Sequence, residues 1–157
     1  QLKCTSSEAK DFINAYFSRF PRIRDYMEEI KQQLDLNGYV ETLFKRRIYI
    51  NGNDSKNQRL RGFAERQAIN APIQGTAADI IKIAMVQLHR NLSDHKDQIS
   101  MLMQVHDELV FEINENKIEK FTNIILPIME TANLPIVPLN VKLKVDTGYG
   151  KNWAEAH

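Results

Sequence analysis

Apolar residues near the start of the chain recur at the spacing of an α-helix, and polar residues mark where each helix should begin and end. The Thr5 hydroxyl can accept a hydrogen bond from a backbone N–H while Glu8 reaches back, a pattern that predicts a helix start. A second helix is predicted from Pro21, which suits a first helical turn, to Asn37, because Gly38 favours a left-handed cap. Two successive helices therefore open the chain.

The hydrophobic period changes after Gly38. Tyr39–Leu43 and Arg47–Ile50 are rich in residues that favour strands, and Phe44-Lys45-Arg46 connects them, which predicts a short hairpin. Residues 51–57 are Asn, Gly, Asp, Ser and Lys, a composition typical of a loop.

Two further helices are predicted beyond this loop. Residues 59–71 have a helical pattern that Pro72 should interrupt, because proline lacks a backbone donor and biases the preceding residue away from the helical region. A new helix should then begin at once and run to Leu92. Its few charges and apolar face are typical of a helix that packs under a sheet.

The last part of the chain predicts a second hairpin, a covering helix and a closing strand. Ile99–Val105 and Leu109–Ile113 are apolar runs on either side of His106-Asp107. Lys117–Thr131 is amphipathic at helical spacing, and Leu139–Val145 alternates apolar and polar residues. The whole order of elements predicts an α+β fold with an antiparallel sheet.

Composition and charge narrow the classes of function. The chain has 157 residues, 43% of them hydrophobic, and its formal net charge of +1 is too small for a protein that coats polyanions along its whole surface. Basic residues are concentrated between Tyr39 and Arg66, where seven Lys and Arg stand against three Asp and Glu. Any affinity for nucleic acid must therefore come from local placement of charge.

Several other features set expectations about context. The single cysteine, Cys4, cannot form an internal disulfide, so we expect a reducing compartment, and no apolar run reaches the roughly 18 residues of a membrane span. We therefore expect a cytoplasmic protein without membrane contact. Because the first residue is Gln1 and no signal pattern follows it, we expect the chain to begin inside a longer protein.

Asp107 and Glu108 are the candidate catalytic residues. They stand at a tight turn between two apolar strands, where an aspartate could supply a fixed oxygen ligand to Mg²⁺. Successive strand residues point to opposite faces, so the two carboxylates should not serve one point equally. For the His-Asp dipeptide alone, the simpler interpretation is that aspartate forms a turn.

A resemblance to a known family favours the metal-ligand interpretation of Asp107 over the turn-former interpretation. The run Gln104 to Glu112 resembles motif C of the family A DNA polymerases, of the bacterial DNA polymerase I type. Three other stretches resemble the same family in the same order, and the likeness extends over essentially the whole chain. They are Gly38 to Leu43, Ala64 to Lys82, and Asn152-Trp153.

The resemblance implies roles for individual residues. Asp107 corresponds to the motif C aspartate that holds the two catalytic Mg²⁺ ions, Glu108 to an adjacent acid with a lesser role as metal ligand, and His106 to a residue near the primer terminus. A further group of residues corresponds to those that hold primer-template DNA near the active site. Apart from the resemblance, a second group of basic residues are candidate phosphate contacts, for which a solvated surface charge is at least as strong an interpretation. The first group is Arg66, Asn70 and Gln74, and the second includes Arg46, Arg47 and Arg61.

The resemblance also implies an architecture. Residues 1–60 should form the rear of the fingers subdomain and residues 61–157 the palm of a right-hand polymerase fold. The partners implied are primer-template DNA, a deoxynucleoside triphosphate (dNTP) and the remainder of the polymerase chain. Such a polymerase would act in DNA replication or repair. We expect a cytoplasmic, nucleoid-associated protein, and an organellar origin is left open.

The sequence departs from the family in two ways. Lys45 and Asn51 stand where members usually have glycine and proline, which puts the geometry of the first hairpin in question. The motif A aspartate and the motif B helix are absent, so we expect no nucleotidyl transfer by these 157 residues alone. The alternatives are a non-catalytic nucleic-acid-binding module with a palm fold and, less favoured, a metal-dependent phosphohydrolase, which would need more grouped ligands.

Overall fold

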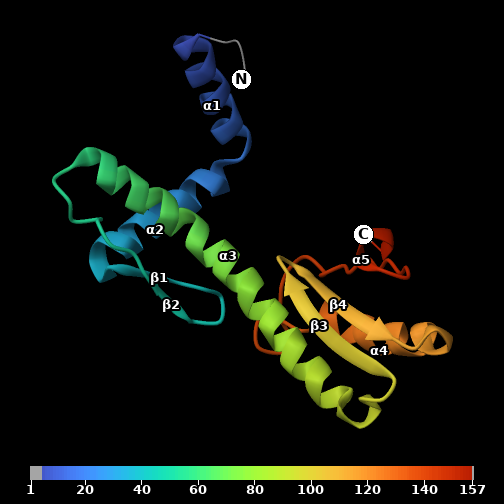
Figure 1. Cartoon of the computed structure of the whole chain (residues 1–157). Coiled ribbons are helices and arrows are strands. Elements are labelled where there is room, and N and C mark those ends of the chain that lie inside the picture. The colour runs from blue at the N-terminus through green and yellow to red at the C-terminus, as the bar shows by residue number, and fades with distance from the viewer. Residues whose placement is uncertain (1–4, 157) are drawn as a thin grey trace. The chain divides into compact units, whose positions relative to one another are not determined.

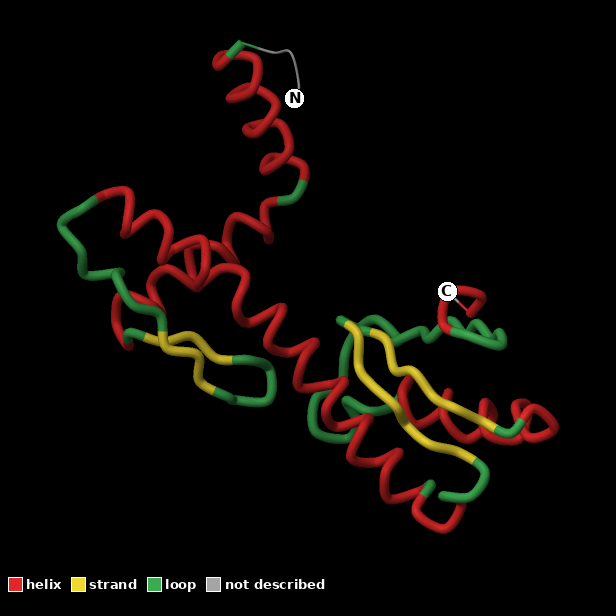
Figure 2. The backbone as a smooth tube through the Cα atoms, in the orientation of Figure 1, coloured by secondary structure: helices red, strands yellow, loops and turns green. Residues whose placement is uncertain are grey.

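The computed structural model describes residues 5–156, and it divides into two compact units, Gln1–Ile73 and Gln74–His157 (Figure 1). The expectations about Gln1 and Cys4 concern residues outside the described range. Both units combine helices with one antiparallel pair of strands (Figure 2). The predicted α+β class with antiparallel strand pairing is therefore confirmed.

Unit 1 begins with the two predicted helices, α1 (Ser6–Arg19) and α2 (Pro21–Asn37). The Thr5 hydroxyl accepts a hydrogen bond from the Glu8 N–H, and the Glu8 carboxylate accepts one from the Thr5 N–H at 2.7 Å, which completes the predicted capping box. Pro21 occupies the first turn of α2. Gly38 ends that helix in the left-handed conformation, with φ 71°.

The first hairpin consists of β1 (Tyr39–Glu41) and β2 (Arg47–Tyr49), with Tyr39 opposite Tyr49. Its strands are shorter than predicted because residues 42–46 form the connection. Val40 is fully buried, and Ile48 packs beside it against a core made with α2 and the following helix. The buried members of that core are Ile30, Leu34, Val40, Ile50, Ala64 and Ala68.

One long helix, α3 (Gln58–Asn91), replaces the two helices predicted around Pro72, and the boundary between the units falls within it. The predicted interruption is wrong. Proline removes one helical hydrogen bond and costs about 3 kcal/mol, but Pro72 is itself buried, and Ala71 before it packs against the core of unit 1. Burial of Ala64, Ala68 and Ala84 along the helix outweighs the lost bond.

Unit 2 places a second hairpin on two helices. Strands β3 (Ile99–Val105) and β4 (Glu108–Ile113) pair as predicted, and α4 (Ile118–Glu130) is the covering helix. Short 3-10 turns precede β3 at Ser93–His95 and α4 at Glu115–Lys117. The core combines the end of α3 with β3 and α4, and its buried members are Leu88, Leu92, Ile99, Phe121 and Ile125.

The predicted closing strand is absent from the described residues, since 139–145 lie in irregular structure. An alternating pattern of apolar and polar residues does not by itself make a strand, because the backbone N–H and C=O groups of a strand need a neighbouring strand as hydrogen-bond partner. The Val145 N–H instead donates to the Glu130 carboxylate at 3.3 Å. A short helix, α5 (Trp153–Ala156), follows. The backbone at Gly148 lies so close to the Ala156 carbonyl oxygen that a Cβ there would overlap it, so this position requires glycine.

Across residues 5–156, every helix is too short or too polar to cross a membrane.

Lys45 generates a test of the first hairpin. Its φ of 66° lies in the left-handed region, which costs a residue with a Cβ about 1 kcal/mol or more. We expect Lys45→Gly to raise the free energy of unfolding by up to about 1 kcal/mol, after the larger chain entropy of unfolded glycine is subtracted. Urea unfolding measures the change.

Lys45→Val is the matched comparison, because its branched Cβ tolerates positive φ least. Lower stability of the glycine variant than of the valine variant would contradict the assigned turn.

Candidate functional site

Asp107 stands in the two-residue connection between β3 and β4. Val105 pairs with Glu108, so only His106 and Asp107 form the turn, and both are exposed. His106 has φ 52°, a conformation that most residues avoid, and the Gln104 side-chain amide donates to the His106 carbonyl oxygen at 2.8 Å. This clamp holds the strained residue and fixes where the next residue, Asp107, leaves the backbone.

The pairing register places Glu108 on one face of the hairpin. Leu109, Phe111 and Ile113 pack against the core of unit 2, so the alternate positions of β4 lie on the other face. Glu108 occupies that second face, opposite Val105, and is half-buried. The two acids thus differ in setting, with Asp107 exposed at the tip and Glu108 anchored in a strand.

A bulge in β3 contributes to this arrangement. Met101 pairs with Phe111 and Met103 with Val110, which leaves Leu102 as the extra residue. Because a shift of one residue exchanges the two faces, the bulge decides which side chains of the last part of β3 face the core. Beyond the bulge, Gln104 pairs with Leu109, and its polar side chain lies beside the turn.

The carboxylates of this turn fit part of a magnesium site. Carboxylate oxygens are the protein ligands that Mg²⁺ prefers, and an exposed aspartate leaves room for its waters and phosphates. Within residues 5–156, however, no three His, Cys, Asp or Glu side chains are grouped closely enough to hold a metal ion. Asp107 and Glu108 offer oxygen atoms of the kind that Mg²⁺ prefers, but the described residues around them do not complete a set of ligands.

The residues assigned to primer-template DNA lie on α3. Arg66 and Asn70 belong to unit 1, are four residues apart on one helical face, and are exposed. Arg66 extends back along the helix, since a Cβ at Gly62 would lie 3.5 Å from its Nη1. Gln74, exposed as well, is the first residue of unit 2.

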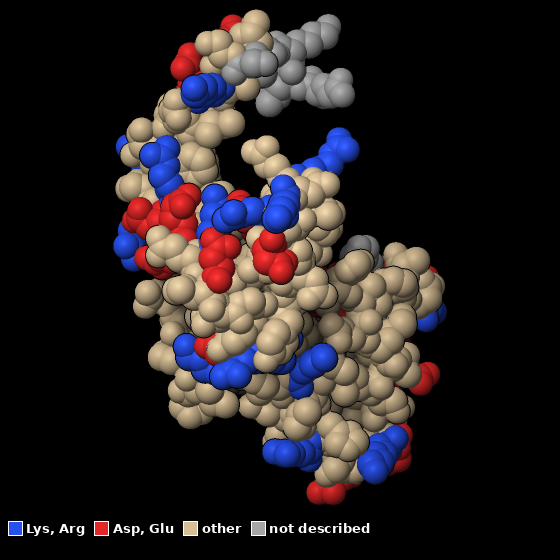
Figure 3. Space-filling view, turned by 90° about the vertical axis from the view of Figure 1, so that its left-hand side faces the viewer, with Lys and Arg blue, Asp and Glu red and all other residues tan. Residues whose placement is uncertain are grey.

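The candidate phosphate contacts are exposed, and two of them already have acidic neighbours. Arg61 contacts the carboxylates of Asp35 at 3.2 Å and Glu65 at 3.3 Å. Arg47 lies 3.6 Å from the Glu41 carboxylate. Basic side chains likewise lie beside acidic ones on the face drawn in Figure 3, so positive charge is interrupted there.

Arg47 is also held by aromatic side chains. Its guanidinium carbon lies 4.7 Å from the centre of the Tyr39 ring. A hydrogen bond with the Tyr49 side chain, followed by the electrostatic effect of Tyr39, raises the pKa of the Arg47 guanidinium. Arg46, its neighbour in the sequence, donates its backbone N–H to the Thr42 hydroxyl at 3.2 Å and is exposed.

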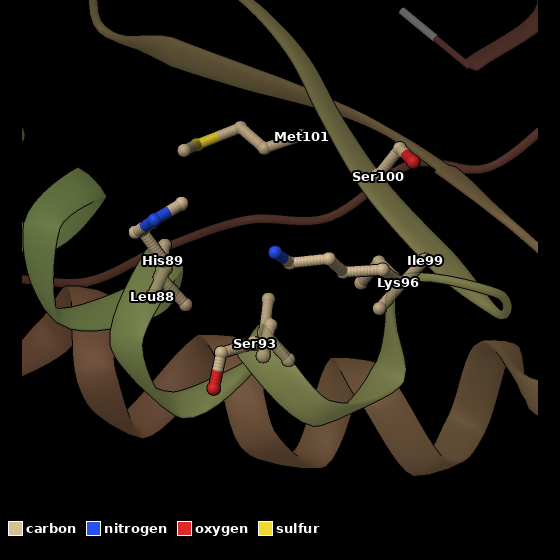
Figure 4. A pocket seen from close by; sticks show the side chains of 8 residues that line it. Leu88, His89, Ser93, Lys96, Ile99, Ser100 and Met101 are labelled. Atoms are coloured by element: carbon tan, nitrogen blue, oxygen red, sulfur yellow. The ribbon is translucent and has the colours of Figure 1, made fainter.

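A pocket of about 220 Å³ lies elsewhere in unit 2, between the end of α3 and the start of β3 (Figure 4). Figure 4 shows the Lys96 amino group extending into it on the side of His89. Its lining contains no carboxylate, so it offers no oxygen ligands of the kind that Mg²⁺ prefers. The residues that line it are Leu88, His89, Leu92, Ser93, Lys96, Ile99, Ser100 and Met101.

Sequence reasoning missed two features of these sites. Gln104 was given no role beyond its place in the motif C match. Its position two residues before His106 could have suggested a hydrogen bond from its side-chain amide to the His106 carbonyl oxygen. The ring of Tyr39 lies 5.4 Å from that of Tyr49, and this pair required the hairpin register to become visible.

Comparison with known proteins gives one consistent result. The model for "DNA polymerase family A" matches residues 1–155. DNA polymerase I of Rhizobium leguminosarum is 48% identical over 159 residues, which cover 100% of this chain and 16% of that protein. DNA polymerase I of Streptococcus pneumoniae (strain TIGR4) is 46% identical over 99% of this chain and 17% of that protein.

A solved structure agrees. The POL domain of Pol1 from M. smegmatis, in complex with DNA primer-template and dNTP, has a TM-score of 0.90 and 42% identity over 99% of this chain and 27% of that chain. The chain thus spans about a sixth of the length of the curated relatives, 16% and 17% of the two compared. With likeness to these relatives over nearly its whole length, the chain belongs to DNA polymerase family A.

Proposed function

We propose that this chain supplies the motif C part of the active site of a DNA-directed DNA polymerase, in which a primer 3′ hydroxyl attacks the α-phosphorus of a dNTP and pyrophosphate leaves. The single observation that carries the proposal is Asp107, held exposed on a clamped two-residue turn in a family A chain. Residues 1–60 would belong to the fingers and residues 61–157 to the palm.

The residues of the turn have separate tasks in this proposal. Asp107 and Glu108 would hold Mg²⁺, with Asp107 as the principal ligand because it is the more exposed. When bound, Mg²⁺ supplies positive charge to the attacking and leaving oxygens. Gln104 keeps the turn in one conformation, and His106 would lie near the primer terminus.

Contacts with primer-template DNA would come from α3 and the first hairpin. Arg66, Asn70 and Gln74 would reach the minor groove, whose acceptors are nearly the same for every base pair and so report duplex shape without reading sequence. Arg46, Arg47 and Arg61 would face phosphates. Such contacts weaken as salt rises, and those of Arg47 and Arg61 must compete with Glu41, Asp35 and Glu65.

The remainder of a longer polymerase would complete the site. The support is that Asp107 has too few acidic or imidazole neighbours in residues 5–156 to hold a metal alone, and that the relatives are about six times longer, since the chain covers 16% and 17% of them. Such an enzyme would act on the DNA of the nucleoid in the cytoplasm.

Asp107→Asn tests the metal-ligand role in the polymerase that contains this chain. Asparagine keeps the shape but loses the charge, so we expect nucleotide incorporation to fall by roughly a thousandfold or more, as expected when electrostatic stabilisation of a transition state is lost. The dissociation constant for primer-template should change little. Single-turnover incorporation and DNA-binding titrations measure the two effects.

Asp97→Asn is the matched control, because Asp97 is an exposed aspartate that precedes β3 at the end opposite the turn. Turnover within tenfold of wild type in the Asp107 variant, or an equal loss in the Asp97 variant, would refute the assignment.

The isolated chain provides a second test. Because residues 5–156 contain no group of ligands large enough to hold a metal ion, we expect the purified 157-residue chain to extend no primer in the presence of Mg²⁺ and all four dNTPs. The measurement is gel-resolved primer extension, with the Asp107→Asn chain prepared in parallel to reveal contaminating polymerase. Extension by the unaltered chain that disappears in the variant would show that no further segment is needed.

A further inference from the structure

The pocket between the end of α3 and the start of β3 has an apolar floor. Leu88 is fully buried, and Leu92 and Ile99 leave only 8% and 5% of their surfaces exposed. All three line the pocket and belong to the core of unit 2. The lining residues fall within 88–101, so unit 2 forms the pocket alone. A ligand that enters it would cover apolar core surface, which favours an apolar group.

The polar side chains directed into this pocket carry nitrogen atoms. The Lys96 amino group extends into the space toward the His89 ring (Figure 4). The hydroxyls of Ser93 and Ser100 are directed away from that space, and the Ser93 hydroxyl donates to the Arg90 carbonyl oxygen at 3.0 Å. The pocket thus presents an ammonium group, with an imidazole near it, beside an apolar floor.

The Lys96 amino group is available to a ligand. Within the part of the chain that the structure describes, no carboxylate forms an ion pair with it. Asp94 and Asp97 are its neighbours in the sequence, but the Asp94 carboxylate accepts from the Ser93 hydroxyl at 3.3 Å and the Asp97 carboxylate from the Gln98 amide at 3.3 Å. An ammonium group that no protein carboxylate contacts favours a ligand with negative charge.

The volume of the pocket limits the size of that ligand. The pocket encloses about 220 Å³. Drug-sized molecules occupy pockets of about 300–1,000 Å³, whereas an apolar cavity of about 150 Å³ holds one benzene molecule. A single ring or a short alkyl chain with one charged group therefore fits. A nucleotide, with its base, sugar and phosphates, is too large.

We propose that this pocket binds a small apolar carboxylate of about the size of benzoate. The ring or alkyl chain covers the floor made by Leu88, Leu92 and Ile99, and the carboxylate lies beside the Lys96 amino group. The site is separate from the turn at Asp107, because the pocket adjoins the first residues of β3 and the turn follows its last. It therefore adds a ligand site to a part of unit 2 that the proposed function leaves unused.

Benzoate titrations of the polymerase that contains this chain test the proposal, with ligand-observed NMR as the measurement. Wild type should bind benzoate saturably, with a dissociation constant on the order of 1 mM for so small a ligand. Lys96→Met keeps the apolar stem and removes the charge, so its dissociation constant should be roughly 3- to 10-fold higher, as expected for a charge-assisted contact at an exposed lysine. Lys142→Met, the matched control at another exposed lysine of unit 2, should bind within about twofold of wild type.

Two further probes separate the charge from the apolar contact. Benzyl alcohol keeps the ring and lacks the charge, so the preference of wild type for benzoate over benzyl alcohol should disappear in Lys96→Met. Acetate keeps the carboxylate and lacks the ring. Because it buries almost no apolar surface, it should show no saturable binding at the concentrations that saturate with benzoate.

Several outcomes would overturn the proposal. These are the absence of saturable benzoate binding by wild type, equal affinity of wild type and Lys96→Met, or binding of acetate as tight as that of benzoate. Equal weakening in Lys142→Met would also overturn it, because the charge effect would then be general. The result is independent of catalysis, since Asp107→Asn changes turnover and should bind benzoate as wild type does.

Discussion

The hydrogen bond from the Gln104 amide to the His106 carbonyl oxygen is the contact on which the candidate site depends. A two-residue connection between antiparallel strands needs positive φ, and here histidine, not glycine, adopts it. Strain of this kind persists only where neighbouring structure determines it, and it is common at functional sites. Its consequence is that Asp107 leaves the backbone in a fixed direction, which a metal ligand requires.

The support for that turn comes from the core of unit 2. Phe121 and Leu88 are fully buried, and they join α4 and the end of α3 to the face of β4 that carries Leu109 and Phe111. A two-stranded hairpin alone is marginally stable, so packing on these helices keeps the strands in register. The bulge at Leu102 then adjusts which residues of β3 face the core next to the turn.

Sequence predicted the features that local chemistry decides. The helix ends at Thr5, Pro21 and Gly38 follow from hydrogen bonds and backbone preferences within a few residues. The turn at Asp107 followed from two apolar runs, and the departure from the family pattern at Lys45 coincides with a strained residue. These signals need no knowledge of distant neighbours.

The remaining features depend on tertiary structure. The expected break at Pro72 was outweighed by burial along α3, and residues 139–145 form no strand within the described chain because alternation does not supply a pairing partner. Arg47 contacts Tyr39 and Tyr49 because of the register of the first hairpin, whose connection was predicted two residues too short at its start. In each case the deciding contact lies across strands or along a packed helix.

A double-mutant cycle between Gln104 and Asp107 tests the account most directly. The measurement is the single-turnover rate of nucleotide incorporation by the polymerase that contains this chain, in wild type, Gln104→Ala, Asp107→Asn and the double variant. If Gln104 acts by positioning Asp107, its replacement slows the wild-type enzyme but adds no further loss to Asp107→Asn. Two losses that multiply in the double variant would contradict the account, because Gln104 would then act independently of the carboxylate.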